Sequence, residues 1–287
     1  MRVLVTGVRG QLGHDVVLHL REAGRECRGV DQEDFDLTDA ASVMACVREY
    51  RPTVIVHCAA YTAVDRAESD ADLCCRVNGQ GTGNLVKAAL DVDAALVYVS
   101  TDYVFGGDGE TPFETDAPKN PRNVYGMSKL QGEMAVTAQM EKYFVVRTSW
   151  VYGLNGKNFV RTMLRLGAER DEVSVVCDQI GSPTYSDDLA LLLCRMIQTR
   201  KYGVYHATNE GFCSWAEFAE AIMEEGGLKC RVRPIPTSEY PTPASRPLNS
   251  RLSKESLDRA GFPRLPEWRE ALKAYIRCLN TENGKER

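Results

Sequence analysis

The chain has 287 residues, of which 44% are hydrophobic and 26% are charged, and its formal net charge at pH 7 is -5. This composition is ordinary for a soluble globular protein and argues against a surface built to bind nucleic acid. The length suits one large α/β domain or two smaller ones. No apolar run approaches the roughly 18 residues that a membrane span needs, so we expect neither a nucleic-acid partner nor a membrane partner.

The start of the chain and its cysteines predict a cytoplasmic protein. A strand-like run begins at Arg2, without the basic segment and long apolar run of a secretory signal before it. The ten cysteines form no CxxC pair, and none clusters with the four histidines. We therefore expect reduced cysteines rather than disulfides or zinc ligands, and we predict no metal site.

A glycine-rich turn follows the first predicted strand. Residues 2–6 are apolar and β-branched, and a helical pattern of apolar residues runs on from Val16. Between them lie three glycines with the spacing GxxGxxG, namely Gly7, Gly10 and Gly13. Backbone N–H groups at a helix N-terminus can bind a pyrophosphate, so a glycine triplet at the head of a βαβ unit predicts a dinucleotide site.

An acid at the end of the second predicted strand, residues 26–31, bears on the choice of cofactor. Asp31 lies eighteen residues after Gly13, where a ribose-binding carboxylate is expected in such folds. It would favour NADH by repelling the 2′-phosphate of NADPH, whereas Arg9 and Arg28 could attract that phosphate. Asp31 could equally serve a turn, so the sequence predicts NADPH or NADH without choosing between them.

The next elements continue the alternation of strands and helices. Thr38 or Asp39 is the expected N-cap of a helix, and residues 52–60 form an apolar run typical of a buried parallel strand. The helix predicted near 78–90 is rich in glycine and asparagine, which are unfavourable in helices. We expect close packing or a local polar role there.

Three residues further on form a candidate catalytic set. The strand predicted at 94–100 leads directly into Thr101, and ligands of open α/β sheets bind at the carboxyl ends of strands. Tyr125 and Lys129 are four residues apart, so on a helix they share a face and the ammonium can stabilise a phenolate. Such a tyrosine can exchange a proton with a carbonyl oxygen. The loop at 106–121 between them is long, and long loops are often functional.

Beyond the strand predicted at 144–148 the alternation loosens. The further predicted elements are a helix at 159–167, a strand at 173–177, a loop at 179–185, a helix at 187–196, a strand at 203–207 and a helix at 215–225. The stretch 234–247 has five prolines and, with the residues after it, carries arginines suited to phosphate. We predict a doubly wound parallel sheet in residues 1–150 and a smaller C-terminal α/β region in 151–287, with about 173–210 returning to the first domain.

Seven motifs spread over nearly the whole chain match one known family. They lie at residues 7–13, 59–68, 100–105, 123–129, 147–152, 178–184 and 246–250. In these motifs the chain resembles the dTDP-4-dehydrorhamnose reductases of the extended short-chain dehydrogenase/reductase superfamily. The resemblance implies a Rossmann-type fold and NAD(P)H-dependent reduction of the C4 keto group of dTDP-4-dehydro-L-rhamnose to dTDP-L-rhamnose, the last step of dTDP-rhamnose biosynthesis.

The resemblance also implies roles for individual residues. Tyr125 would be the proton donor, Lys129 would lower its pKa and touch the nicotinamide ribose, and Thr101 would orient the keto oxygen. Cofactor contacts are implied for Gly7, Gly10, Gln11, Leu12, Gly13, Asp31, Asp36, Leu37, Ala59, Ala60, Tyr61, Tyr125 and Lys129. Contacts with the dTDP-sugar are implied for Thr101, Asp102, Tyr125, Trp150, Arg246 and Asn249. Some family members carry magnesium at a dimer contact, but the sequence has no acidic cluster that predicts one, and both a monomer and a homodimer remain open.

Three alternatives share parts of this pattern. A sugar-nucleotide 4,6-dehydratase would need a second acid after Asp102, where the chain has Tyr103. A C4 epimerase or another sugar-nucleotide reductase is harder to separate on residues alone. A non-catalytic regulatory subunit, similar to that of methionine adenosyltransferase, has no chemical need for the intact set of Thr101, Tyr125 and Lys129.

Overall fold

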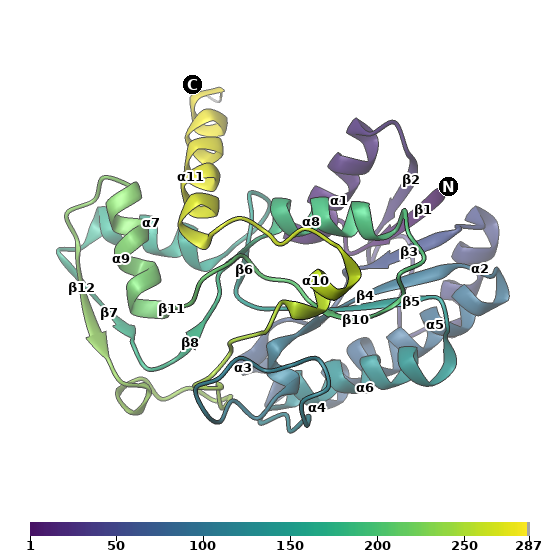
Figure 1. Ribbon diagram of the computed structural model, residues 1–287, viewed down its shortest axis with the longest axis horizontal. Coiled ribbons are helices and arrows are strands. Elements are labelled where there is room, and N and C mark those ends of the chain that lie inside the picture. Colours follow the sequence, from purple (N-terminus) through teal and green to yellow (C-terminus); the bar gives the residue numbers. More distant parts are fainter. Residues whose placement is uncertain (286–287) are drawn as a thin grey trace.

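The centre of the protein is a sheet of six parallel strands. The computed structural model describes residues 1–285, with side chains as far as residue 281. The strands lie in the order β10-β5-β4-β3-β1-β2 (Figure 1). Their bounds are β1 Arg2–Thr6, β2 Glu26–Val30, β3 Val54–His57, β4 Ala95–Thr101, β5 Tyr143–Thr148 and β10 Gly203–His206. The strand order reverses beside β1, which confirms the predicted doubly wound sheet.

Helices cover both faces of this sheet (Figure 1). The helices on one face are α1 (Gln11–Glu22) and α8 (Ser186–Met196), and those on the other are α2 (Ala40–Tyr50), α5 (Thr82–Asp91) and α6 (Val124–Gln139). Successive residues of a strand point to opposite faces. In β1 the side chains therefore alternate between the hydrophobic cluster of α1 and α8 and that of α2 and α5. Burial on both faces explains why the strands read as continuous apolar runs.

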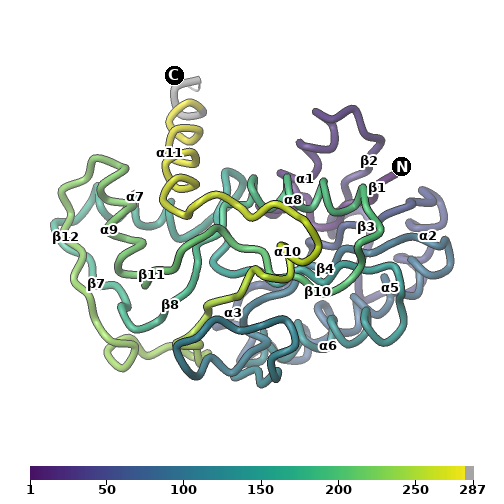
Figure 2. The backbone as a smooth tube through the Cα atoms, viewed as in Figure 1, coloured from purple at the N-terminus to yellow at the C-terminus, as the bar shows by residue number. Residues whose placement is uncertain are grey.

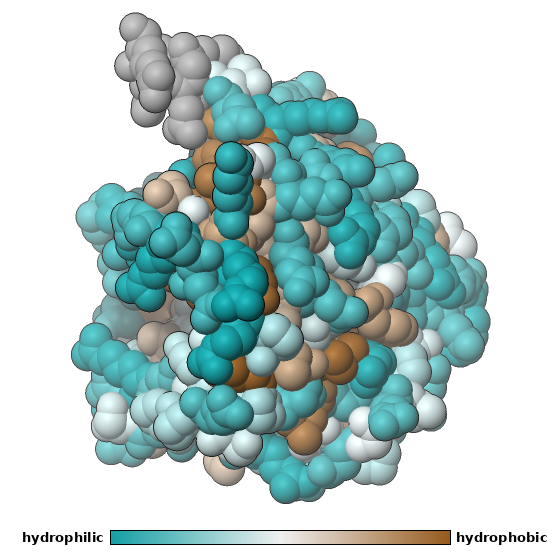
Figure 3. All heavy atoms as spheres, turned by 90° about the vertical axis from the view of Figure 1, so that its left-hand side faces the viewer, coloured by the Kyte–Doolittle hydropathy of each residue, from teal (hydrophilic) through white to brown (hydrophobic). Residues whose placement is uncertain are grey.

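The C-terminal part of the chain forms a second hydrophobic core. It is built around α7 (Phe159–Glu169), α9 (Trp215–Glu225) and α11 (Trp268–Lys285). Beside them β7 (Glu172–Val176) and β12 (Arg231–Ile235) pair in parallel. Figure 2 shows these elements at the end of the molecule away from the N-terminus, with α11 projecting from it. That end is mostly hydrophilic on its surface, with hydrophobic atoms gathered in a band (Figure 3).

Short elements connect the two parts. The two-residue strands β6 (Val151–Tyr152) and β9 (Thr184–Tyr185) pair in parallel, while β8 (Ile180–Gly181) and β11 (Cys213–Ser214) pair antiparallel. The remaining helical segments are α3 Val64–Ala67, α4 Ala71–Cys75, η1 Arg76–Gly81, η2 Asp102–Val104, η3 Thr237–Glu239 and α10 Glu255–Ala260.

Residues of about 173–210 were expected to pack with the first domain, but the first part of this range does not. Strand β7 pairs with β12 instead of joining the central sheet. Helix α8 packs in the same hydrophobic cluster as α1, and β10 pairs with β5. Within that range, the chain therefore rejoins the central sheet only from α8 onward.

The helix expected near 78–90 starts with an irregular turn. A π-helical segment, η1, precedes α5 and contains Asn78 and Gly79. Such wide turns within helices are frequent at functional sites. At the earlier helix start, Asp39 and not Thr38 is the N-cap, because its side chain accepts the N–H of Ala41 at 2.9 Å.

Three further features concern the helices, the cysteines and the possible metal ligands. None of the helices in residues 1–285 is both long and apolar enough to cross a membrane. All ten cysteines are unpaired. The described residues also contain no group of three or more His, Cys, Asp or Glu side chains placed to hold a metal ion.

Candidate active site

The glycine turn between β1 and α1 has the form that an anion requires. Gly7 adopts a φ of 73°, and a Cβ atom there would lie 2.6 Å from the backbone nitrogen of Ala59 at the end of β3. A larger residue is therefore excluded both by conformation and by space. Gly10, the N-cap of α1, provides no side-chain cap, which leaves the first N–H groups of α1 for a bound group. Backbone N–H groups so placed fit the pyrophosphate of a dinucleotide.

The acid after β2 supports the turn. One oxygen of the Asp31 carboxylate accepts the N–H of Arg9 and the other that of Gln32, each at 2.9 Å. The Arg9 guanidinium pairs with Glu33, and Arg28 pairs with Glu49 at 3.3 Å. Asp31 thus takes the turn role in this structure, next to the glycine turn, where a ribose-binding carboxylate was expected.

Two further expected cofactor residues follow on the loop before α2. Asp36 accepts the N–H of Thr38 at 2.8 Å. The carbonyl of Leu37 accepts the side-chain amide of Asn84 at 3.0 Å, which ties this loop to α5.

Asn78 links the end of β3 to the helix that carries Tyr125. Its side chain exchanges two hydrogen bonds with the backbone of Tyr61, at 2.7 and 3.0 Å. It also donates to the hydroxyl of Ser128 at 2.9 Å, and that hydroxyl donates to the carbonyl of Tyr125 at 2.7 Å. Of the two expectations for the 78–90 segment, close packing or a local polar role, Asn78 fits the polar role. Ala59 is fixed separately, because its N–H donates to Thr6 Oγ1 at 3.2 Å.

The candidate catalytic residues meet where β4 ends and α6 begins. Thr101 is the last residue of β4, and Tyr125 lies in the first turn of α6. The ring of Tyr103 contacts that of Tyr125 edge-on, with centroids 5.8 Å apart. Lys129 is only 3% exposed, and its ammonium lies 4.1 Å from the ring centre of Tyr98. The Thr101 hydroxyl thus lies beside the Tyr125 phenol, while Lys129 follows one turn further along α6 with its ammonium over Tyr98.

Two side chains cap the start of α6. The Asn123 side chain accepts the N–H of Gly126 at 2.7 Å, and Glu68 accepts the N–H of Val124 at 2.9 Å. Glu68 belongs to one of the family motifs, yet no local pattern predicts that it caps a helix 56 residues away. These caps fix the turn that presents Tyr125.

Burial shifts the pKa values of the tyrosine and the lysine in opposite directions. It raises the pKa of Tyr125 well above its usual value, the charge of Asp102 adds to the shift, and the nearby Thr101 hydroxyl opposes it. Burial lowers the pKa of Lys129 to about 7, against the opposing charge of Glu133. Tyr125 therefore holds its proton at neutral pH, as a proton donor must, while Lys129 changes charge near neutrality.

Asp102 is a buried carboxyl beside this set. It is 3% exposed, and its Oδ1 atom accepts the Thr101 hydroxyl at 3.1 Å. Its Oδ2 atom is buried without a hydrogen-bond partner among the described residues. Burial raises the pKa of Asp102 to about 6, although the nearby hydroxyls of Ser250 and Thr101 lower it.

Trp150 occupies a strained position at the junction of the two parts. Its φ of 48° is in the left-handed region, which is rare for a bulky residue. Its indole stacks on Trp215, with centroids 3.7 Å apart and an interplanar angle of 15°. Strain of this kind persists only where the surroundings enforce it, and it is common at ligand sites. No pattern in the sequence predicts Trp215 as its partner.

Arg246 and Asn249 are both engaged by protein groups. The Arg246 guanidinium donates to both carboxylate oxygens of Asp65, at 2.9 and 2.7 Å. Asn249 is 1% exposed, and its amide donates to the carbonyl of Thr111 at 2.8 Å. In this structure the two residues therefore hold the 246–250 segment against the body of the protein.

A buried ion pair that the sequence analysis missed lies on the same face of α6. Arg147 of β5 donates two hydrogen bonds to Glu133, at 2.8 and 2.7 Å, and one to the carbonyl of Thr115 at 2.8 Å. It also contacts Nε2 of His206 at 3.2 Å. The signal was present in the spacing, because Glu133 follows Lys129 by four residues. This pair joins α6 to the 106–121 loop.

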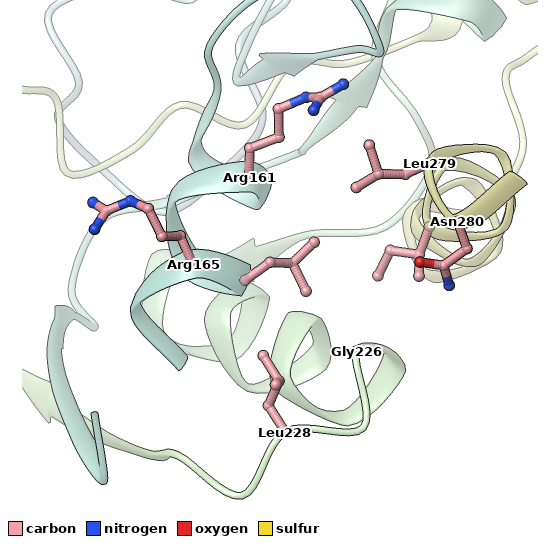
Figure 4. Close-up of a pocket in the computed structure, with 8 residues that line it drawn as sticks. Arg161, Arg165, Gly226, Leu228, Leu279 and Asn280 are labelled. Carbon is pink, nitrogen blue, oxygen red and sulfur yellow. The ribbon is translucent and has the colours of Figure 1, made fainter. Parts of the chain in front are cut away.

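One hollow on the protein lies away from these residues. It has a volume of about 380 Å³ and is lined by Arg161, Leu164, Arg165, Gly226, Leu228, Ile276, Leu279 and Asn280. Figure 4 shows it between α7, the end of α9 and α11. It shares no residue with the site at the end of β4.

A doubly wound sheet that presents a tyrosine and a lysine one helical turn apart, beside a strand-end threonine, is the arrangement of the extended short-chain dehydrogenases/reductases. The comparisons place the chain more narrowly. It belongs to the family described as RmlD substrate binding domain, whose model matches residues 1–281.

Relatives of known name agree with the resemblance seen in the motifs. The chain is 42% identical over 291 residues to dTDP-4-dehydrorhamnose reductase of Streptomyces griseus, covering 99% of this chain and 96% of that protein. It is 41% identical over 275 residues to spore coat polysaccharide biosynthesis protein SpsK of Bacillus subtilis (strain 168), covering 96% of each. The crystal structure of dTDP-4-dehydrorhamnose reductase from Bacillus anthracis str. Ames in complex with NADP has a TM-score of 0.94 and 44% identity, covering 96% of this chain and 98% of that one. The predicted family is therefore confirmed.

Proposed function

We propose that this protein reduces the C4 keto group of dTDP-4-dehydro-L-rhamnose to dTDP-L-rhamnose with NADPH or NADH, the last step of dTDP-rhamnose biosynthesis. The observation that carries the proposal is that Thr101, the last residue of β4, lies beside Tyr125, which Lys129 follows by one turn of α6. Full-length relatives named for this activity support the choice of substrate.

The residues divide the work of the reaction between them. A reduced nicotinamide, when bound, supplies the hydride. Thr101 turns its hydroxyl from Asp102 to the keto oxygen and donates a hydrogen bond there, and Tyr125 gives its phenolic proton to the alkoxide that develops. The ammonium of Lys129 stabilises the phenolate that Tyr125 leaves behind. One ketone, one hydride and one proton thus give one alcohol.

The two ligands occupy different parts of the chain in this proposal. Residues 1–150 hold the cofactor, and residues 151–287 mainly hold the sugar nucleotide. The cofactor contacts are Gly7, Gly10, Gln11, Leu12, Gly13, Asp31, Asp36, Leu37, Ala59, Ala60, Tyr61, Tyr125 and Lys129. The contacts with the dTDP-sugar are Thr101, Asp102, Tyr125, Trp150, Arg246 and Asn249. Arg246 would have to share its guanidinium between Asp65 and a phosphate of the nucleotide. The reaction takes place in the cytoplasm, in a monomer or a homodimer.

The test is a spectrophotometric assay with the purified protein. dTDP-4-dehydro-L-rhamnose, generated in situ by the preceding epimerase, is mixed with NADPH or NADH, and the loss of reduced-cofactor absorbance is followed. Rapid oxidation that depends on the sugar is expected, and the better cofactor settles the role of Asp31. A protein that binds a reduced cofactor but oxidises neither in the presence of the sugar would contradict the proposal.

A further inference from the structure

A segment of the C-terminal part lies directly on the glycine turn. Residues 153–158 connect β6 to α7, and the side-chain amide of Asn155 donates to the carbonyl of Arg9 at 2.8 Å and to that of Gly10 at 3.3 Å. The partners are 146 and 145 residues apart in the sequence. A single amide group therefore reaches two successive peptide units of the turn.

These contacts set the direction of backbone N–H groups. A peptide unit is planar, so fixing its carbonyl also fixes the N–H at its other end. The unit between Arg9 and Gly10 is held at both ends, because the Gly10 N–H donates to Gly7 at 3.0 Å while Asn155 holds the Arg9 carbonyl. The next unit joins the Gly10 carbonyl, also contacted by Asn155, to the N–H of Gln11 at the head of α1.

A second asparagine holds the side chain of the next residue in the turn. Asn158 donates to Oε1 of Gln11 at 3.0 Å, and Gln11 in turn contacts the carbonyl of Val151 at 3.4 Å. Asn158 is also the N-cap of α7, since its Oδ1 atom accepts the N–H of Arg161 at 2.9 Å. The start of α7 and the start of α1 are thus fixed by one side chain.

We infer that Asn155, supported by Asn158, is a positioning residue for pyrophosphate recognition: it orients the glycine-turn peptides and couples cofactor binding to the C-terminal part of the chain. The inference rests on the proposed function only in taking the turn as the dinucleotide site. It does not depend on which sugar is reduced.

The experiment compares the parent protein with Asn155→Ala in calorimetric titrations with NADPH and with ADP-ribose, without sugar. Without the two contacts the Arg9 and Gly10 carbonyls lose their hydrogen bonds to Asn155 and the turn is held less firmly, so both ligands, which share the pyrophosphate, should bind roughly tenfold more weakly. Gln139→Ala is the matched control, because it removes an amide that donates to a carbonyl at 3.1 Å on an exposed part of α6. The control should bind both ligands as the parent does.

Hydrogen exchange of the parent gives a second measurement that needs no variant. NADPH and ADP-ribose should each slow exchange in peptides covering 153–158. The reason is that the bound pyrophosphate rigidifies the glycine turn, to which this segment is hydrogen-bonded. Parent-like affinity of Asn155→Ala, an equal loss in Gln139→Ala, or no protection of 153–158 would each overturn the inference. A parent that binds NADPH with protection but reduces no sugar would contradict only the proposed function, and a parent that binds neither ligand would overturn both.

Discussion

The half-buried Tyr125 and the buried Asp102 are two acids close to Thr101, and their pKa values suit different states. Burial keeps the phenol of Tyr125 protonated, which suits a group that gives a proton to an alkoxide. The carboxyl of Asp102 is also favoured in its neutral form by burial, but its pKa of about 6 lies within the physiological range. The site therefore holds one acid that is always protonated and one that titrates.

The role of Tyr125 is tested by Tyr125→Phe. Removing the hydroxyl leaves the ring and its contact with Tyr103 in place, so affinity for NADPH should stay nearly unchanged. Turnover should fall by roughly 10²- to 10⁴-fold, the usual contribution of general acid catalysis. Steady-state kinetics and a fluorescence titration with NADPH measure the two quantities, and near-normal turnover would remove Tyr125 as the donor.

The titration of Asp102 should appear in the stability of the protein. Because burial raises its pKa from 3.8 to about 6, the folded state binds more protons than the unfolded state between these values. The group's contribution to stability therefore falls as pH rises through about 4 to 6, by up to about 3 kcal/mol. Asp102→Asn should lose this pH dependence.

Urea denaturation at pH 4 and at pH 7 measures the effect. The stability of Asp102→Asn relative to the parent should rise between the two values, whereas Asp171→Asn, at an exposed position, should follow the parent. A parallel shift of parent and Asp102→Asn with pH would show that Asp102 is ionised throughout.

Helix α6 sets three groups on one face at intervals of four residues. Tyr125, Lys129 and Glu133 follow one another along it, and Glu133 is fixed by the buried guanidinium of Arg147. The negative charge of Glu133 favours the charged form of Lys129, while burial opposes it. The pKa of Lys129 thus depends on Glu133 of the same helix and on Arg147 of β5, which holds Glu133 in place.

Glu133→Gln tests this relation through the pH profile. Lys129 supports the reaction when charged, so kcat/KM for reduction should fall as pH rises above about 7. Without the Glu133 charge the pKa of Lys129 should drop further, and the falling limb should move to lower pH. The exposed Glu141→Gln removes a charge near the end of the same helix and should leave the profile unchanged.

The same variant should also be less stable, because Arg147 loses its charged partner in a buried position. A cost of about 3 to 5 kcal/mol is typical when one member of a buried pair is removed, and urea denaturation measures it. An unchanged falling limb in a folded Glu133→Gln protein would show that Lys129 does not control the reaction.

Elements were predictable from the sequence where their signals are local. The first strand, the glycine turn and the helix after it lie within about twenty residues, and the spacing of Tyr125 and Lys129 fixes their common face. Contacts between distant segments left no such signal. The Asn155 contact with Arg9 and the Asp65 contact with Arg246 each join residues more than 140 positions apart, and either asparagine or arginine alone is an ordinary surface residue.

At the scale of the whole molecule, two hydrophobic cores share one continuous chain. The first lies on both faces of the central sheet and the second lies among α7, α9 and α11. The segment from Trp150 to Asn158 joins them, and its two asparagines donate hydrogen bonds to the glycine turn and to Gln11. A ligand bound at the turn should therefore stabilise both cores together.

This coupling predicts the effect of NADPH on unfolding. At a concentration of 100 times its Kd, NADPH should add about 2.7 kcal/mol to the free energy of unfolding. The thermal midpoints of the two cores should rise together, as followed by differential scanning calorimetry. A rise confined to one of two separated transitions would show that the cores unfold independently.

The stacked indoles of Trp150 and Trp215 have a spectroscopic consequence. The chain has three tryptophans, and all of them, including the buried Trp268, lie in or beside the second core. Residues 1–149 contain none. Intrinsic tryptophan emission therefore reports on the C-terminal part alone. The two stacked indoles, with ring centroids 3.7 Å apart, should also give an exciton couplet in circular dichroism. This couplet should vanish when the stack opens.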